Sequence, residues 1–225
     1  MSNVGFRIHT KINRPSKELI NSFAGLPVSN IADNMNRMFC ADFGIKPYNN
    51  AKLFGCAFTV KVAPGDNLMF HKALDLAQPG DVLIVDGQGD TTNSICGEIL
   101  SRYAKSRGLA GFVVDGAIRD AGGIRELDFP VYARGVNPKG PYKNGPGEIN
   151  IPVACGGVVV HPGYIVVGDE DGVVFINPDD AEVILKNTQA LAAIEAKTIA
   201  AIEAGTMERS WIDKVLKEKG CEIVD

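Results

Sequence analysis

The apolar positions in the middle of the chain form short continuous runs, and segments with helical spacing stand between them. The runs predict strands over residues 56–62, 81–86, 111–115 and 130–134. The intervening segments predict helices over residues 66–77, 98–107 and 121–127. Buried strands that alternate with helices are typical of βα units with parallel pairing. The pattern therefore predicts an α/β domain.

Different patterns flank this region. Helices are expected from Pro15 and over residues 28–38. Beyond a loop rich in Pro and Gly, three short apolar runs are separated by tight turns that contain Gly and Asp. Runs joined in this way predict antiparallel strands, which here cover residues 158–160, 164–167 and 172–176. The sheet should thus contain both parallel and antiparallel pairs.

The C-terminal part is expected to be helical. Asp179 and Asp180 predict the cap of a long helix, whose apolar residues recur at helical spacing, and a further helix follows it. A chain of 225 residues without internal repeats is expected to form one domain over residues 1–225. Its core should cover about residues 25–180, and its C-terminal helices about residues 179–220.

Composition is that of an ordinary globular protein, with 45% hydrophobic and 22% charged residues. The net charge of −4 gives no global field that would attract nucleic acid, so an anionic substrate would need a local positive site. The five cysteines form no CxxC pair and the three histidines no HxxxH spacing, which disfavours disulfides and a zinc site built from them. A signal pattern and a membrane-spanning apolar run are both lacking, so we expect a cytoplasmic protein with no membrane partner.

Two strand-to-helix junctions could carry chemistry. The first contains Gly87 and Gly89 and leads into a helix start near Gly97, where free backbone N–H groups can bind a phosphate or a carboxylate. The two glycines begin a dinucleotide-binding fingerprint, but Thr92 stands where that fingerprint needs a third glycine. The partial fingerprint is weak evidence, because a plain tight turn would by itself need the glycines.

The second junction contains Arg119 and Asp120, which follow a predicted buried strand. An arginine can bind a carboxylate through two parallel hydrogen bonds, and an aspartate can hold a hard divalent cation. Together they suit a substrate with a carboxylate and a metal-binding carbonyl. An alternative stays open, in which Arg119 pairs with a neighbouring carboxylate and Asp120 caps the following helix.

Several ordered runs make the chain resemble the RraA-like family, which includes the 4-hydroxy-4-methyl-2-oxoglutarate aldolases. The runs are residues 28–33, 79–82, 97–100, 104–120, 125–134 and 168–173, within a resemblance over about residues 25–180. Aldolases of that family show an acidic residue, twenty intervening residues and then Arg-Asp. Glu98 precedes Arg119 and Asp120 by this spacing.

The resemblance implies a fold and a site. The fold would be an α/β swivelling ββα-type domain with a mixed sheet, N-terminal helices and a C-terminal helical extension. The backbone of Gly97, Glu98, Ile99 and Leu100 would bind the substrate carboxylate. Arg119 would bind the oxo-acid oxygens, Asp120 would ligate Mg²⁺ or Mn²⁺, and Glu98 would position a catalytic water. A homotrimer or a hexamer is the expected assembly.

The implied activity is that of a metal-dependent lyase acting on a small 2-oxo acid. It would cleave a 4-hydroxy-2-oxo acid to give pyruvate, decarboxylate oxaloacetate, or do both, through an enolate. Two departures from the family pattern bear on this expectation. Glu98 is one methylene longer than the Asp of characterised aldolases, and Gly123 stands where they often carry an acid that holds metal-bound water.

Two other functions are open to such a sequence. The family takes its name from a regulator that inhibits a ribonuclease, so the chain could be a non-catalytic binding protein. The presence of Glu98, Arg119 and Asp120 at the aldolase spacing favours the enzyme. A methyltransferase acting on a quinone precursor is less well supported, because the chain has no glycine-rich cofactor loop with a downstream ribose-binding acid.

Overall fold

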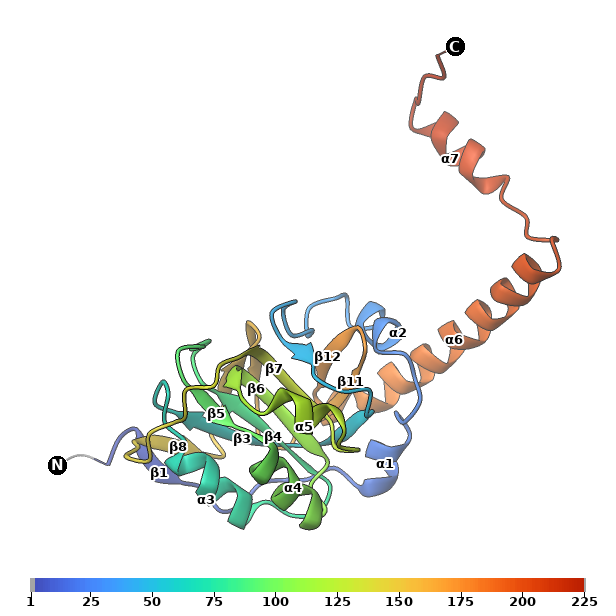
Figure 1. Cartoon of the computed structure of the whole chain (residues 1–225). Helices are drawn as coiled ribbons and strands as arrows, with labels where there is room; N and C mark the ends of the chain where they lie inside the picture. The colour runs from blue at the N-terminus through green and yellow to red at the C-terminus, as the bar shows by residue number, and fades with distance from the viewer. Residues whose placement is uncertain (1–2, 225) are drawn as a thin grey trace. The chain divides into compact units, whose positions relative to one another are not determined.

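The computed structural model describes residues 3–224 of the chain (Figure 1). The chain forms two compact units, of which the first ends at Thr188 and the second begins at Gln189. The second unit contains the C-terminal part of helix α6 (Ala181–Glu203) and helix α7 (Trp211–Glu218). The single-domain organisation expected from the sequence stays a prediction.

Four parallel strands form the centre of the first unit. They are β3 (Leu53–Val62), β4 (Asp81–Asp86), β6 (Gly111–Ile118) and β7 (Val131–Val136), which pair in that order. Helices α3 (Leu68–Leu76), α4 (Glu98–Ser106) and α5 (Ala121–Arg125) lie in the connections between them. This confirms the predicted alternation of strands and helices.

Antiparallel and short strands extend this centre. Strand β11 (Ile165–Asp169) pairs antiparallel with β3 and with β12 (Gly172–Ile176). The remaining strands of the sheet are β1 (Phe6–Ile8), β2 (Lys46–Pro47), β5 (Ser94–Cys96) and β8 (Gly147–Ile149). A separate hairpin joins β9 (Val153–Cys155) and β10 (Val158–Val160). The sheet thus contains the parallel and antiparallel pairs that the sequence predicted, but residues 158–160 do not join it as expected, because they pair with β9 in the separate hairpin.

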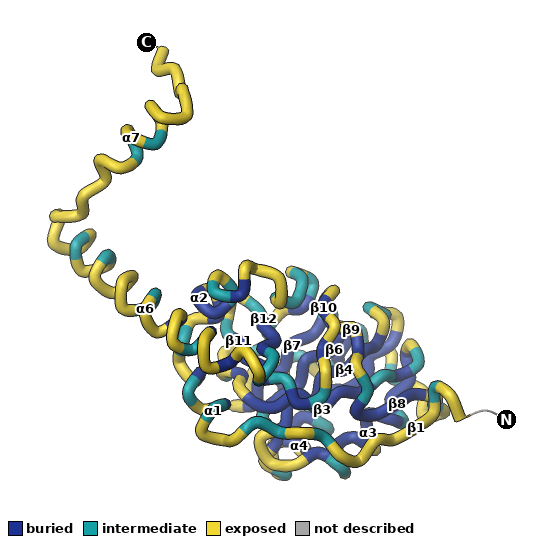
Figure 2. The backbone as a smooth tube through the Cα atoms, turned by 180° about the vertical axis from the view of Figure 1, so that it is seen from behind, coloured by how far each residue is buried: buried dark blue, intermediate teal, exposed yellow. Residues whose placement is uncertain are grey.

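Alternation along β4 explains how the layers form. Leu83 and Val85 pack with residues of α3, α4 and α5 on one face of the sheet. Val82 and Ile84 pack with β9, β10 and β12 on the other face. Successive side chains of a strand point to opposite faces, so a strand that is apolar throughout must be covered on both sides. Figure 2 shows the central strands as the buried part of the molecule.

A third cluster covers the β11–β12 pair. Helices α1 (Lys17–Asn21) and α2 (Val28–Asp33) pack there together with the first residues of α6. Among residues 3–224, none of the helices combines the length and the apolar character that crossing a membrane requires.

Several predicted boundaries differ from the structure, and three of the differences have a clear local cause. Helix α2 ends at Asp33 instead of residue 38, because Asn36 and Arg37 take positive φ angles and the Arg37 N–H bonds back to the Ala32 carbonyl. Strand β6 continues to Ile118, because β5 pairs with its last residues. The turn before α6 (Pro178–Asp180) is capped by Asn177, whose side chain accepts from the Asp179 N–H, and not by Asp179 or Asp180.

Candidate functional site

The two junctions predicted from the sequence lie side by side. Strands β5 and β6 run parallel, with Cys96 opposite Ile118, and the Arg119 N–H donates to the Cys96 carbonyl at 2.9 Å. The chain leaves β5 into α4 and leaves β6 into α5 at the same edge of the sheet. Ligands of α/β sheets bind beyond the carboxyl ends of strands, so this edge is the expected place for a site.

Gly97 allows the two junctions to approach closely. It is the N-cap of α4, and a Cβ at this position would collide with Asp120 Oδ2 and lie 2.9 Å from Arg119 Cγ. The Glu98 N–H reaches Asp120 Oδ2 at 3.4 Å, which is a weak hydrogen bond. The start of α4 therefore packs directly on the Arg119–Asp120 pair.

Asp120 holds an unusual backbone conformation. Its φ of 55° and ψ of 38° lie in the left-handed region, which costs a residue with a Cβ on the order of 1–3 kcal/mol. Its side chain makes no capping hydrogen bond to α5 and is 44% exposed. The alternative interpretation of Asp120 as a side-chain cap is therefore wrong. The carboxylate remains available to a ligand.

Arg119 is not neutralised by a tight ion pair. Its Nε lies 3.6 Å from Asp120 Oδ2, beyond hydrogen-bonding distance, and its side chain is 43% exposed. A Cβ on Gly140 would lie 3.1 Å from Arg119 Nη1, which places the guanidinium beside the loop that precedes β8. This geometry leaves donors of the guanidinium free to bind an anion.

A cavity of about 160 Å³ opens at this edge of the sheet. It is lined by Asn67, His71, Cys96, Gly97, Ile99, Leu100, Arg119, Asp120, Pro141 and Lys143. Drug-sized ligands fill cavities of about 300–1,000 Å³, so this one suits a smaller molecule. Five of the six residues predicted from the sequence are on its wall.

Glu98 is the sixth predicted residue, and the structure places it beside the cavity instead of on its wall. Its Oε1 accepts from Arg102 Nε at 2.7 Å and lies 2.6 Å from Arg102 Nη2. The backbone of Glu98 faces Asp120, while its carboxylate rests against α5 at Gly123.

Sequence reasoning missed three polar residues of the wall. Asn67 is the N-cap of α3, His71 lies within α3, and Lys143 comes from the loop before β8. The Asn67 amide donates to the Ile95 carbonyl at 2.8 Å, while its buried Oδ1 has no partner. Helix α3 follows β3, so the rule applied to the other two junctions could have found Asn67 and His71. Nothing in the local sequence indicates Lys143.

Burial and charge adjust two groups on the wall. Burial lowers the pKa of His71, and the neighbouring Lys143 lowers it further, which favours the neutral imidazole. Burial also raises the pKa of the Cys96 thiol to about 12, so it stays protonated near neutral pH. A thiolate ligand or nucleophile is therefore not offered by Cys96.

The residues of the wall fit a hard cation that keeps most of its water ligands better than a cation enclosed by several protein ligands. Among residues 3–224, no three His, Cys, Asp or Glu side chains gather to enclose a metal ion. Asp120 contributes a half-exposed carboxylate whose hydrogen bond to the protein is weak. Magnesium commonly binds through one or two carboxylates and keeps several waters, so this arrangement is compatible with it.

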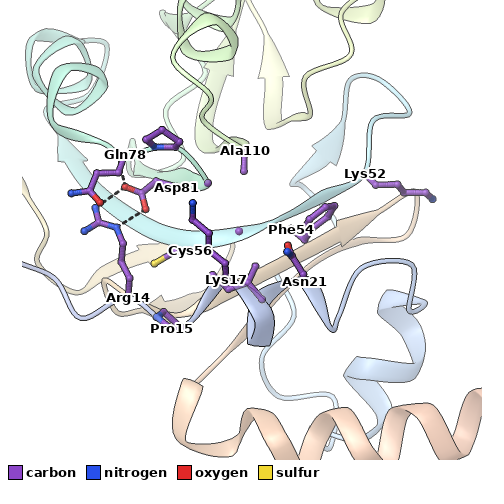
Figure 3. Close-up of a pocket in the computed structure, with 14 residues that line it drawn as sticks. Arg14, Pro15, Lys17, Asn21, Lys52, Phe54, Cys56, Gln78, Asp81 and Ala110 are labelled. Carbon is purple, nitrogen blue, oxygen red and sulfur yellow. Dashed lines mark hydrogen bonds and ion pairs between the residues drawn. The ribbon is translucent and has the colours of Figure 1, made fainter.

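A different hollow, of about 560 Å³, lies at the opposite ends of the strands (Figure 3). There Arg14 binds both oxygens of Asp81 at 2.9 and 2.7 Å, and the Gln78 N–H also donates to Asp81. Burial raises the pKa of the Cys56 thiol to about 12. The Asp81 carboxylate is thus held by structural bonds and the thiol is protonated, so this hollow suits catalysis less well.

Comparison with known proteins identifies proteins that are similar to this chain. A protein of Halalkalibacterium halodurans that carries the provisional name 4-hydroxy-4-methyl-2-oxoglutarate aldolase is 39% identical over 201 residues, covering 88% of this chain and 96% of that protein. A solved structure from Streptomyces coelicolor, described as an unusual member of the RNase ES inhibitor RraA family, is 31% identical with a TM-score of 0.75. It covers 83% of this chain and 98% of the other.

The RNA-processing inhibitor RraA from Thermus thermophilus is also similar, with 32% identity and a TM-score of 0.62. That match covers 67% of this chain and 92% of the inhibitor. The family match itself, to the RraA-like family described as Aldolase/RraA, extends over residues 28–175 and so includes both junctions of the site. The chain belongs to the RraA-like family.

Proposed function

We propose that this protein is a metal-dependent lyase that cleaves a C–C bond of a small 2-oxo acid. The reaction would be retro-aldol cleavage of a 4-hydroxy-2-oxo acid to give pyruvate, decarboxylation of oxaloacetate, or both. The observation that carries the proposal is the shared cavity wall of Arg119, Asp120 and the first turn of α4. A guanidinium, a carboxylate and the first backbone N–H groups of α4 meet there, and the contacts of the carboxylate with Arg119 and with the Glu98 N–H are long, at 3.6 and 3.4 Å.

The substrate would be held from two sides. The first N–H groups of an α-helix have no partner within the helix, so the backbone from Gly97 to Leu100 can donate to the carboxylate of a 2-oxo acid. Arg119 would donate to the 2-oxo oxygen and to the carboxylate. When the C–C bond breaks, negative charge grows on the 2-oxo oxygen, and the Arg119 guanidinium stabilises it there.

Asp120 would hold a Mg²⁺ or Mn²⁺ ion with water in most of the other positions. A divalent cation in this place supplies Lewis acidity at the 2-oxo group. Asp120 lines the cavity in a left-handed backbone conformation, and its side chain makes no capping hydrogen bond to α5 that would explain this conformation. The strain at this residue is therefore consistent with a binding role.

Glu98 would transfer protons through water. Its carboxylate is held at the side of the cavity, with Arg102 on one flank and α5 on the other. From this position it can take the proton of a 4-hydroxyl group by way of a water molecule. It can return a proton to the product carbon in the same way.

The non-catalytic regulator is a second candidate, because an RNA-processing inhibitor is among the similar structures. A pyruvate-release assay over a panel of 4-hydroxy-2-oxo acids and oxaloacetate separates the two. We expect turnover of at least one of them with Mg²⁺ or Mn²⁺ present. Absence of turnover over the whole panel with both metals would favour the regulator.

The trimer or hexamer stays a prediction, which light scattering would check.

Replacing Arg119 by Lys is expected to lower kcat/KM by about 10–150-fold, which corresponds to the loss of about 1.5–3 kcal/mol from a charged hydrogen bond. Lys keeps the charge but lacks the planar fork that binds two oxygens at once. The melting temperature should stay nearly unchanged, because Arg119 is half exposed and no buried charge loses its partner. Steady-state kinetics and thermal unfolding measure the two effects.

The matched control is Arg125→Lys, which changes an exposed arginine at the end of α5. It should leave both kcat/KM and the melting temperature within experimental scatter. Equal activity of the Arg119→Lys and Arg125→Lys variants would remove Arg119 from the proposed site.

A further inference from the structure

The carboxylate of Glu98 occupies space that a side chain at position 123 would fill. A Cβ on Gly123 would collide with Glu98 Oε2 and Cδ, and it would lie 2.9 Å from Oε1. At the neighbouring Gly122, a Cβ would meet no atom within 4 Å. A side chain at position 123 would therefore displace the Glu98 carboxylate, whereas a side chain at position 122 would not touch it.

Arg102 holds the same carboxylate from the other side. It stands one turn after Glu98 on α4, and its Nε and Nη2 lie 2.7 and 2.6 Å from Oε1. A Glu followed four residues later by a basic residue is the favourable order for such a pair on a helix. The Glu98 carboxylate is therefore confined between Arg102 and the surface of α5.

The length of the side chain matters to this arrangement. Aspartate at position 98 would carry its carboxylate one methylene nearer to the α4 backbone, away from Gly123 and from Arg102. The extra methylene of Glu98 and the missing side chain of Gly123 are thus complementary. Gly123 also stands three residues after Asp120. The Glu98 carboxylate therefore lies against the helical turn that begins at Asp120.

Building on the function proposed above, we infer that Gly123 and Arg102 are positioning residues for Glu98. Gly123 gives the carboxylate its place on α5, and Arg102 keeps it there. The two departures from the aldolase pattern, at positions 98 and 123, then form one matched pair. A long acid needs the glycine, whereas a short acid would tolerate a side chain at position 123.

The test compares Gly123→Ala with Gly122→Ala. Both changes add the same methyl group to α5, but only the first reaches Glu98. Gly122→Ala should retain kcat within about twofold. Gly123→Ala should lower kcat by about tenfold or more, since general acid–base catalysis contributes about 10²–10⁴-fold, while KM changes little. Equal kcat values for the two variants would overturn the inference.

The same pair in a Glu98→Asp background shows whether Gly123 acts through Glu98. With the shorter acid, adding Gly123→Ala should cost at most about twofold, because the clash is gone. A loss as large as in the Glu98 protein would mean that Gly123 supports the fold instead, and would refute the positioning role. Arg102→Gln tests the same positioning without adding a side chain that collides with Glu98. It removes the ion pair between Arg102 and the Glu98 carboxylate on the exposed surface of α4, and it should also lower kcat.

Crystal structures of the metal-free variants provide a readout that needs no activity. The Glu98–Arg102 contact should persist in Gly122→Ala and be broken in Gly123→Ala. Its persistence in both would contradict the inference even if the protein is a lyase. If the wild-type protein cleaves none of the 2-oxo acids, the proposed function fails, and the two structures still decide whether Gly123 places Glu98.

Discussion

Removal of divalent metal by EDTA is expected to abolish pyruvate release, and added Mg²⁺ or Mn²⁺ should restore it. Asp120 is the one carboxylate on the cavity wall within the described part of the chain, and its charge is not offset by a close hydrogen-bonded partner. Without a cation, that negative charge would oppose the charge that develops on the substrate oxygen. Pyruvate release before and after dialysis measures the effect.

Asp120→Asn should reproduce the loss that EDTA causes. Asparagine tolerates the left-handed conformation of this residue, so the backbone need not change. Asp128→Asn, which alters a carboxylate that is 94% exposed, is the matched control and should retain full activity. Full activity of the EDTA-dialysed wild-type protein would contradict the metal-dependent mechanism.

Glu98→Gln is expected to lower kcat by about 10²–10⁴-fold, the usual contribution of a general acid or base. Glutamine has nearly the same size and can occupy the same place against Gly123, but it cannot accept a proton. Substrate binding should change little, because the Glu98 carboxylate is not on the cavity wall. Steady-state kinetics would therefore show the loss in kcat with KM nearly unchanged.

The control for this variant is Glu126→Gln, at an exposed acid just beyond α5. It should leave kcat unaltered. If Glu98→Gln also left kcat unaltered, Glu98 would be an acid in the first turn of α4 that stabilises the helix through its dipole.

The sequence alone determined the layered α/β fold. The apolar run from Val82 to Val85 has no polar residue on either face, so it had to lie between two covering layers. It also predicted the edge of the sheet at which a site is expected, because parallel strands end together. The sequence also shows directly that Arg119 and Asp120 are neighbours in the chain.

Strand and helix ends were less predictable, since neighbours in space set them. Strand β6 continues beyond Asp115 because β5 supplies hydrogen-bond partners for its last residues, and β5 itself looks like a loop in the sequence. Helix α2 stops early because the chain reverses at Asn36 and Arg37. Local propensity does not contain these contacts.

Only the tertiary structure decided how the residues of the candidate site come together. Asn67, His71 and Lys143 reach the cavity from α3 and a distant loop, and their positions depend on how those segments pack. The sequence presents Glu98 and Gly123 as two separate departures from a family pattern, whereas folding places one against the other. A side chain's available space is set by atoms that are far away along the chain, so such a pairing exists only once α4 and α5 have packed together.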